Sequence, residues 1–170
     1  PKEQICFRGI NGADLLNVVD GQADSVMNLI NGLVLPTESN DVAQLLSIAD
    51  RDRLLAELYV HLFGDLIQST SACQNCSELI DIEFSLNDWV THLSDTGEQP
   101  VEQRGNTFHW TEKGLDFRLP NGSDEQRIAH QREAVAQEVL MKACAPQAAE
   151  KGIDPLEVQQ MMESFAPVLS

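Results

Sequence analysis

The sequence is poor in basic residues and has no long apolar run. It holds 11 Lys and Arg against 27 Asp and Glu, which gives a formal net charge of −16. Because phosphate backbones and anionic lipids are bound by clustered Lys and Arg, this composition argues against nucleic acid and membrane surfaces as partners. No apolar stretch approaches the roughly 18 residues of a membrane span, and the N-terminus lacks the apolar segment of a signal peptide. The acidity serves either solubility or a charge-complementary partner surface.

Catalytic and nucleotide-binding motifs are also missing. The sequence has no Gly-rich phosphate loop, no nucleophile elbow, no His-Glu-x-x-His string and no EF-hand loop. Carboxylates are abundant, but periodicity places them on solvent-facing sides of their elements, so no acid/base pair stands out. The four cysteines, at positions 6, 73, 76 and 144, are too sparse for the disulfide framework of a small secreted protein and indicate a reducing compartment. We therefore expect a protein that is not an enzyme.

A length of 170 residues suits one domain, or one with a small subdomain, and the pattern of elements predicts a single α+β domain over residues 1–170. Hydrophobic residues make up 42% of the chain, which is typical of a globular protein with a continuous core. Helices are expected to pack around two small antiparallel hairpins. The predicted parts are a helical region over 11–64, a knuckle hairpin over 65–86, a second hairpin over 107–119 and C-terminal helices over 123–167. The chain begins at Pro1 and not at Met, so we expect a trimmed or partial protein.

The N-terminal region predicts short helices. Two apolar-periodic pieces over 13–35, separated at Gly21, indicate two helices, and a further helical segment is expected over 41–46. Cys6 stands among apolar neighbours, which favours a small buried side chain over a metal ligand.

A longer amphipathic helix is predicted to begin at the cap Asp50 and to end at Gly64. Its apolar stripe consists of Leu54, Leu55, Leu58, Leu62 and Phe63. We expect this stripe to be core, so Leu58→Ala should cost about 2–5 kcal/mol. The charged residues 51–53 lie mostly opposite and predict a solvated, salt-bridged face. Catalysis or partner binding by this face and His61 is the alternative.

The most specific feature is Cys73-x-x-Cys76, which lies between two strand-like runs. Over Leu79–Leu86 apolar and polar residues alternate strictly, which predicts a strand with one apolar face. A Cys-x-x-Cys pair at a hairpin turn has the geometry of a zinc knuckle, in which two thiolates reach one tetrahedral ion. A redox pair is expected at the start of a helix, so a dithiol oxidoreductase is disfavoured. Zinc needs two further ligands and none occurs at knuckle spacing nearby, so a pair of free thiols is the alternative.

A loop and a second hairpin are predicted after this region. Residues 94–106 are polar and contain Gly and Pro, which is typical of a mobile loop. Alternation over 107–119, with a turn at Lys113-Gly114, predicts the second hairpin. His109 falls on its polar face, where we expect a solvated side chain more readily than a ligand.

The C-terminal region predicts two helices. Ser123 and Gln126 have capping-box spacing, which indicates one long helix that ends near Cys144. Asp154-Pro155 combines a cap with a first-turn proline and predicts the start of the last helix, which should stop near Pro167.

Two strings of the sequence resemble baseplate proteins of contractile phage tails and of related phage-tail-like injection particles. The first string consists of Arg51-Asp52-Arg53-Leu54-Leu55, Phe63-Gly64-Asp65, Ser69-Thr70, Cys73-x-x-Cys76 and Asp81-x-x-Phe84. The second string is Phe117-Arg118-Leu119-Pro120-Asn121-Gly122-Ser123-Asp124-Glu125. Together they span positions 51 to 125, in matching order and separation.

The resemblance implies a structural, non-enzymatic baseplate subunit of the hub or wedge, or a baseplate assembly factor. Its partners would be other baseplate and tail proteins in a hetero-oligomeric assembly, built in the bacterial cytoplasm and located in the virion tail or injection particle. A zinc-knuckle adaptor that binds a protein partner in bacterial cytoplasm is the alternative function. A small dithiol or metal-dependent enzyme is a third, less favoured one.

The resemblance also bears on zinc. Baseplate proteins of this type have Cys-Pro-x-Cys-Gly knuckles, commonly with a second Cys-x-x-Cys beyond the last helix. This chain has Gln74 in place of the proline and Ser77 in place of the glycine, and it ends before the second pair would occur. The expected metal ligands are therefore Cys73 and Cys76, with zinc as the metal and with the other ligands supplied from outside this chain.

Overall fold

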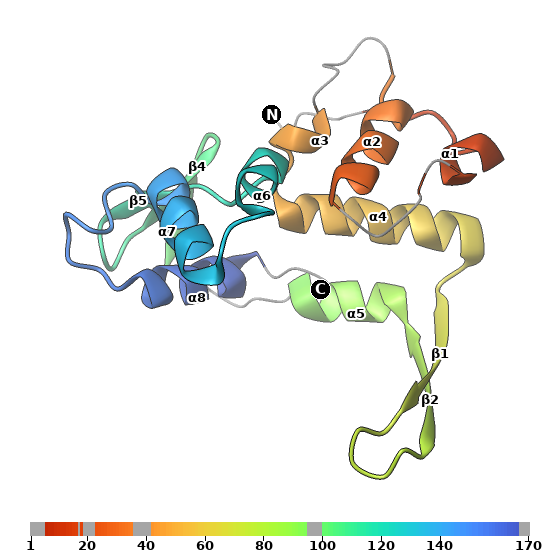
Figure 1. Ribbon diagram of the computed structural model, residues 1–170. Helices are drawn as coiled ribbons and strands as arrows, with labels where there is room; N and C mark the ends of the chain where they lie inside the picture. Colours follow the sequence, from red (N-terminus) through yellow and green to blue (C-terminus); the bar gives the residue numbers. More distant parts are fainter. Residues whose placement is uncertain (1–5, 17, 19–22, 36–41, 95–99, 167–170) are drawn as a thin grey trace. The chain divides into compact units, whose positions relative to one another are not determined.

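The computed structural model describes residues 6–16, 18, 23–35, 42–94 and 100–166 (Figure 1). In this part of the chain the fold is α+β, with eight helices and two small antiparallel sheets, as predicted. The structure divides into two compact units, Pro1–Ile48 with Pro100–Gln159 and Ala49–Gln99 with Gln160–Ser170. The expectation of a single domain stays a prediction.

In the first unit, three N-terminal helices pack with a later one. They are α1 (Gly12–Leu16), α2 (Ala23–Leu33), α3 (Val42–Leu45) and α6 (Gly122–Ile128). The predicted break at Gly21 lies outside the described residues. Met27, Ile30 and Leu33 of α2 are almost fully buried. Gly122 allows α6 to approach closely, because an added Cβ would lie 2.6 Å from the Met27 sulfur and 2.9 Å from the Ala43 carbonyl oxygen.

The first unit also holds a three-stranded antiparallel sheet in the order β3-β4-β5. Its strands are β3 (Val101–Arg104), β4 (Thr107–Trp110) and β5 (Leu115–Phe117). The second hairpin is confirmed as β4–β5, but the expectation of a loop throughout 94–106 is wrong because β3 pairs with β4. Strand β3 is mostly exposed and polar, so its own sequence carries no apolar alternation and the pairing with β4 defines it.

The C-terminal helices differ from the prediction at one boundary. The expected long helix consists of α6 and α7 (Glu133–Cys144), separated by a turn at 129–132. Asn121, and not Ser123, is the N-cap: its side chain accepts from the Asp124 N–H and the Asp124 side chain accepts from the Asn121 N–H. The last helix, α8 (Pro155–Phe165), begins as predicted, with Asp154 accepting from the Leu156 N–H at 2.9 Å.

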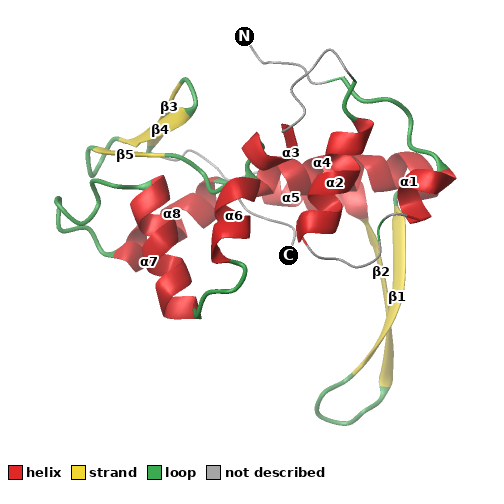
Figure 2. Ribbon diagram, turned by 45° about the horizontal axis from the view of Figure 1, so that its top comes forward, coloured by secondary structure: helices red, strands yellow, loops and turns green. Residues whose placement is uncertain are grey.

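In the second unit, the hairpin of β1 (Leu66–Ala72) and β2 (Leu79–Ser85) connects α4 (Ile48–Phe63) to α5 (Leu86–Ser94). Gly64 ends α4 as predicted, with a φ of 89° that a glycine adopts without strain. Two bonds of Asp65 fix the base of the hairpin: its carbonyl accepts from the Leu86 N–H and its carboxylate from the Asn87 N–H. The hairpin extends away from α4 and α5 (Figures 1 and 2).

The structure of α4 differs from the prediction in its first residue and in which of its side chains are buried. The helix begins at Ile48, before the predicted cap Asp50, and Arg51 is buried at 6% exposure instead of being solvated. Leu62 and Phe63 of the predicted core stripe are 37% and 63% exposed, while Leu54, Leu55 and Leu58 are half-buried. The buried residues Ala49, Arg51 and Ala56 all lie in the first nine residues of the helix, whereas residues 61–63 of the last turn are all exposed. The exposed fraction of the side chains therefore varies along the helix axis, whereas periodicity describes how apolar residues are distributed around the axis.

Candidate functional site

Cys73 and Cys76 lie together at the turn of the β1–β2 hairpin, as the sequence predicts. The Cys73 N–H donates to the Glu78 carbonyl at 2.8 Å, and the Ser77 N–H donates to the Cys73 carbonyl at 2.8 Å. Ser77 has a φ of 60°, which is the left-handed conformation that closes the turn. These bonds hold the two cysteines on one tight loop.

The loop favours a thiolate at Cys73. The backbone N–H groups of Cys76 and Asn75 and the Cys76 thiol donate to the Cys73 sulfur, and they lower the pKa of the Cys73 thiol below its usual value. The Cys76 sulfur lies 3.8 Å from a carboxylate oxygen of Glu78. Since a metal ligand must be deprotonated, the lowered pKa of Cys73 suits a metal-binding sulfur at that position.

A structural zinc site requires four protein ligands, and this loop holds two candidate sulfur atoms. Among the described residues, no group of three or more His, Cys, Asp or Glu side chains could hold a metal ion. Cys144 is buried, and burial raises its pKa to about 11, so it suits a core position and not a ligand. Cys6 is exposed, so the expectation of a buried side chain is wrong: its carbonyl pairs with the Leu35 N–H at 3.1 Å, but its side chain faces solvent.

His109 is part of a cross-strand pair. Its Nδ1 lies 2.6 Å from an Asp116 carboxylate oxygen, in the register His109↔Asp116 of β4 and β5. The contact with His109 is the main reason why the pKa of Asp116 is below its usual range. The His109 side chain is only 18% exposed, so the expectation of a solvated side chain is wrong. The sequence could have predicted this pair, because a turn at Lys113-Gly114 places His109 opposite Asp116.

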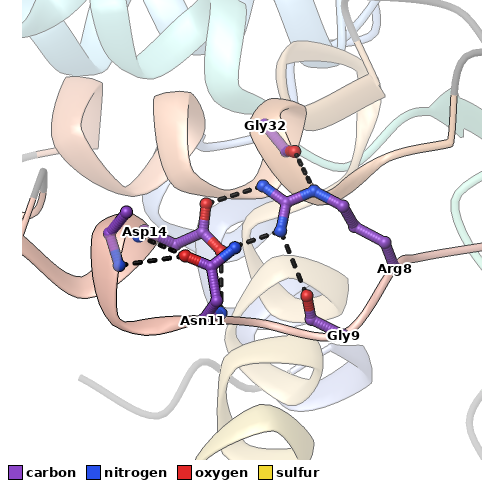
Figure 3. Close-up of polar contacts among 6 residues, drawn as sticks. Arg8, Gly9, Asn11, Asp14 and Gly32 are labelled. Atoms are coloured by element: carbon purple, nitrogen blue, oxygen red, sulfur yellow. Dashed lines mark hydrogen bonds and ion pairs between the residues drawn. The ribbon is translucent and has the colours of Figure 1, made fainter.

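A polar cluster that sequence reasoning missed ties the N-terminal segment to α1 and α2 (Figure 3). The Arg8 guanidinium donates twice to the Asp14 carboxylate, at 2.8 and 2.6 Å, and its Nε donates to the Gly32 carbonyl at 3.1 Å. The bond with Arg8, followed by the Asn11 N–H, lowers the pKa of Asp14 to about 2. No periodic pattern signals this cluster, since Arg8 and Asn11 lie outside regular elements.

Asp14 also borders a hollow of about 300 Å³. The hollow is lined by Asp14, Val18, Ser25, Asn28, Leu29 and Gly32. Both oxygens of the Asp14 carboxylate already accept N–H groups of Arg8, so Asp14 is not a free general base. The cluster instead stabilises the N-terminal segment.

The second string that resembles baseplate proteins forms a buried ion pair. Asp124 is 2% exposed. Its carboxylate accepts hydrogen bonds from both terminal guanidinium nitrogens of Arg118, at 2.5 and 2.9 Å, and from the Asn121 N–H at 3.1 Å. Burial raises the pKa of Asp124, but the bonds from Arg118 and Asn121 outweigh this effect and the pKa is lowered. The Arg118 N–H donates to the Cys144 carbonyl at 2.8 Å, which connects the end of β5 to α7. The string therefore has a structural task.

Comparison with known proteins identifies the family. The profile of the T4 bacteriophage base plate protein family matches residues 13–160, which includes both strings and most of the chain. No curated protein and no solved structure gives a significant match. Within the described ranges, none of the helices has the length and apolar character required to cross a membrane. The chain belongs to the T4 bacteriophage base plate protein family, a family of structural proteins of the phage baseplate.

Proposed function

We propose that this chain is a non-enzymatic subunit of the hub or wedge of a contractile-tail baseplate, or a factor that assembles the baseplate. The same proposal covers the baseplates of related injection particles. The family match over residues 13–160 carries the proposal. The chain would assemble in the bacterial cytoplasm with other baseplate and tail proteins and act in the tail.

The test is deletion of the gene followed by sedimentation of particles from infected or induced cells. We expect particles without complete baseplates, and rescue by a tagged wild-type copy. If the tagged protein sediments with tube and sheath proteins, it is a subunit. If rescue occurs but the protein is absent from finished particles, it is an assembly factor. Normal, infectious particles after deletion would contradict the proposal.

We also propose that Cys73 and Cys76 provide two thiolate ligands to a zinc ion, with the remaining ligands from outside this chain. The lowered pKa of Cys73 and the shared loop support this assignment. The test is metal analysis of the full-length protein, purified without added metal, beside the double variant Cys73→Ser, Cys76→Ser. About one zinc per chain that is lost in the variant is expected. Stoichiometric zinc that survives the double change would contradict the assignment, and absence of zinc from both proteins would favour free thiols.

The turn geometry also favours one second candidate function, a zinc-knuckle adaptor that binds a protein partner in bacterial cytoplasm. The two experiments separate it from the baseplate function. A zinc-containing protein that is dispensable for particle assembly and never sediments with tube and sheath proteins would be an adaptor.

A further inference from the structure

One face of the β1–β2 hairpin is apolar and exposed. In the observed register Phe84 lies opposite Ile67, Ile82 opposite Ser69 and Ile80 opposite Ser71, so these six side chains share one face. Exposure of Ile80, Ile82 and Phe84 is 50%, 42% and 36%. Trp89 of α5 is 48% exposed, and its ring centroid lies 5.7 Å from that of Phe84. We call Ile80, Ile82, Phe84 and Trp89 the hairpin strip.

The hairpin strip contributes little to a core in this chain. All residues of β1 and β2 are exposed except Ile67 and Ser85, which are half-buried, so neither face of this two-stranded sheet is packed along its length. A two-stranded hairpin alone is marginally stable in water, and three or more strands or a packed helix are normally needed. A row of four large apolar side chains on such a hairpin is typical of an interaction surface.

The middle of the other face is polar and acidic, and the exposed Leu66 and Leu79 lie at its two ends. Asp81 accepts from the Thr70 hydroxyl at 2.9 Å, and Glu83 accepts from the Gln68 amide at 2.7 Å. The sequence from residue 54 to residue 99 contains eight Asp and Glu and no Lys or Arg. The hairpin strip is therefore an apolar row on a segment that contains carboxylates but no Lys or Arg.

This charge selects the kind of partner. A second copy of the chain would bring the same acidic segment to the interface, and like charges at an interface oppose association. An apolar groove bordered by Lys and Arg would cover the strip, and its positive charge would attract the negatively charged segment that carries the strip. Aromatic anchors such as Phe84 and Trp89 are typical of the centre of such interfaces.

We propose that the hairpin strip docks into an apolar groove, bordered by Lys and Arg, on another protein of the same baseplate. The partner's identity as a baseplate protein rests on the proposed function, whereas the docking face and the partner's chemistry come from the hairpin itself.

The first experiment locates the contact in assembling tails. Photoreactive benzoylphenylalanine is placed at position 82 of the full-length protein, in cells that produce tails. A matched control places it at position 70, on the opposite face of the same hairpin. We expect crosslinks from position 82, at least about tenfold above position 70, to one other tail protein, at a peptide that contains Lys or Arg. Crosslinks to a second copy, to the chain itself or to a host protein, or equal crosslinks from both faces, would overturn the proposal.

The second experiment measures binding to the purified crosslinked protein. The variant Ile80→Thr, Ile82→Thr keeps β-branched side chains and thus strand preference, so we expect unchanged circular dichroism and at least about tenfold weaker binding. The control Thr70→Ser on the opposite face should bind as the wild type does. The variant Asp81→Asn, Glu83→Gln should bind more weakly and with a smaller salt dependence, because screening acts on charge pairs. Wild-type binding by the Ile variant, or tighter binding by the amide variant, would overturn the proposal.

The two proposals fail in different ways. If the wild type is required in tails and the Ile80→Thr, Ile82→Thr variant is incorporated equally well, the docking proposal fails and the proposed function stands. If the wild type is neither required for tails nor present in them, the proposed function fails, whatever the hairpin variants do.

Discussion

Loss of the Arg118–Asp124 pair should destabilise the first unit strongly. Three N–H groups donate to the Asp124 carboxylate, and this side chain is only 3% exposed. Asp124→Asn keeps the shape but replaces one acceptor oxygen by an NH₂ group and leaves Arg118 without a counter-ion. Breaking a buried pair typically costs about 3–5 kcal/mol. Because Arg118 is 32% exposed, water replaces part of the lost interaction, and we expect about 2–3 kcal/mol.

The assay is urea denaturation, followed by the fluorescence of Trp110. Trp110 is 4% exposed and lies in the same unit, and a Trp89→Phe background makes it the single tryptophan. The control is Arg127→Gln, because Arg127 is 59% exposed and its guanidinium lies 3.9 Å from the same carboxylate. This control should change the free energy of unfolding by less than about 0.5 kcal/mol.

The pH dependence gives a second readout. The pKa of Asp124 is lowered in the folded state, so its stabilising effect is present above the unfolded pKa of about 3.9 and is lost as pH falls through the folded pKa. The difference between wild type and Asp124→Asn should therefore shrink below about pH 4. A cost of Asp124→Asn below about 0.5 kcal/mol at pH 7, or an equal cost of the control, would refute this account of the pair.

Three further outcomes are expected from the contacts of single residues. Gly122→Ala should lower the free energy of unfolding, measured by chemical denaturation, by about 1–3 kcal/mol, because the added Cβ would overlap neighbouring atoms. The control Gly9→Ala, whose Cβ would have no atom within 4 Å, should be near neutral, and equal effects of the two changes would contradict this account. Leu58→Ala should cost about 1–2 kcal/mol, less than a core position, because Leu58 is half-buried; a larger loss of the denaturation midpoint would place it in the core. Iodoacetamide should alkylate Cys73 at lower pH than an ordinary thiol and should spare Cys144 in the folded protein, as peptide mass mapping can check; early labelling of Cys144 would contradict its burial.

The knuckle hairpin could be predicted because its signals are local. Strict alternation over Leu79–Leu86 and a Cys-x-x-Cys turn determine two strands and their connection, and the structure confirms both strands and the proximity of the two sulfurs. The start of α8 is equally local, since Asp154 caps the helix within the same turn.

The wrong predictions depend on neighbours that are distant in sequence. Strand β3 is defined by its pairing with β4, and its own residues carry no apolar alternation. In α4 the residues Ala49 and Arg51, on opposite sides of the helix, are both buried, while Phe63 of the apolar stripe is exposed. Periodicity identifies an apolar face, but it does not tell which turns of a helix another segment covers.

The residues of the two strings that resemble baseplate proteins have different roles in the described part of the structure. In the second string Arg118, Asn121, Gly122 and Asp124 each have a packing or hydrogen-bonding task, so the similarity there reflects the fold of the first unit. In the first string Phe84 lies on an exposed hairpin with little core to maintain. Phe84 contacts Trp89 of the same unit, and the apolar face around this ring pair is the surface that we propose for docking. A substitution in the second string should therefore act on stability, whereas a substitution on the hairpin strip should act on binding.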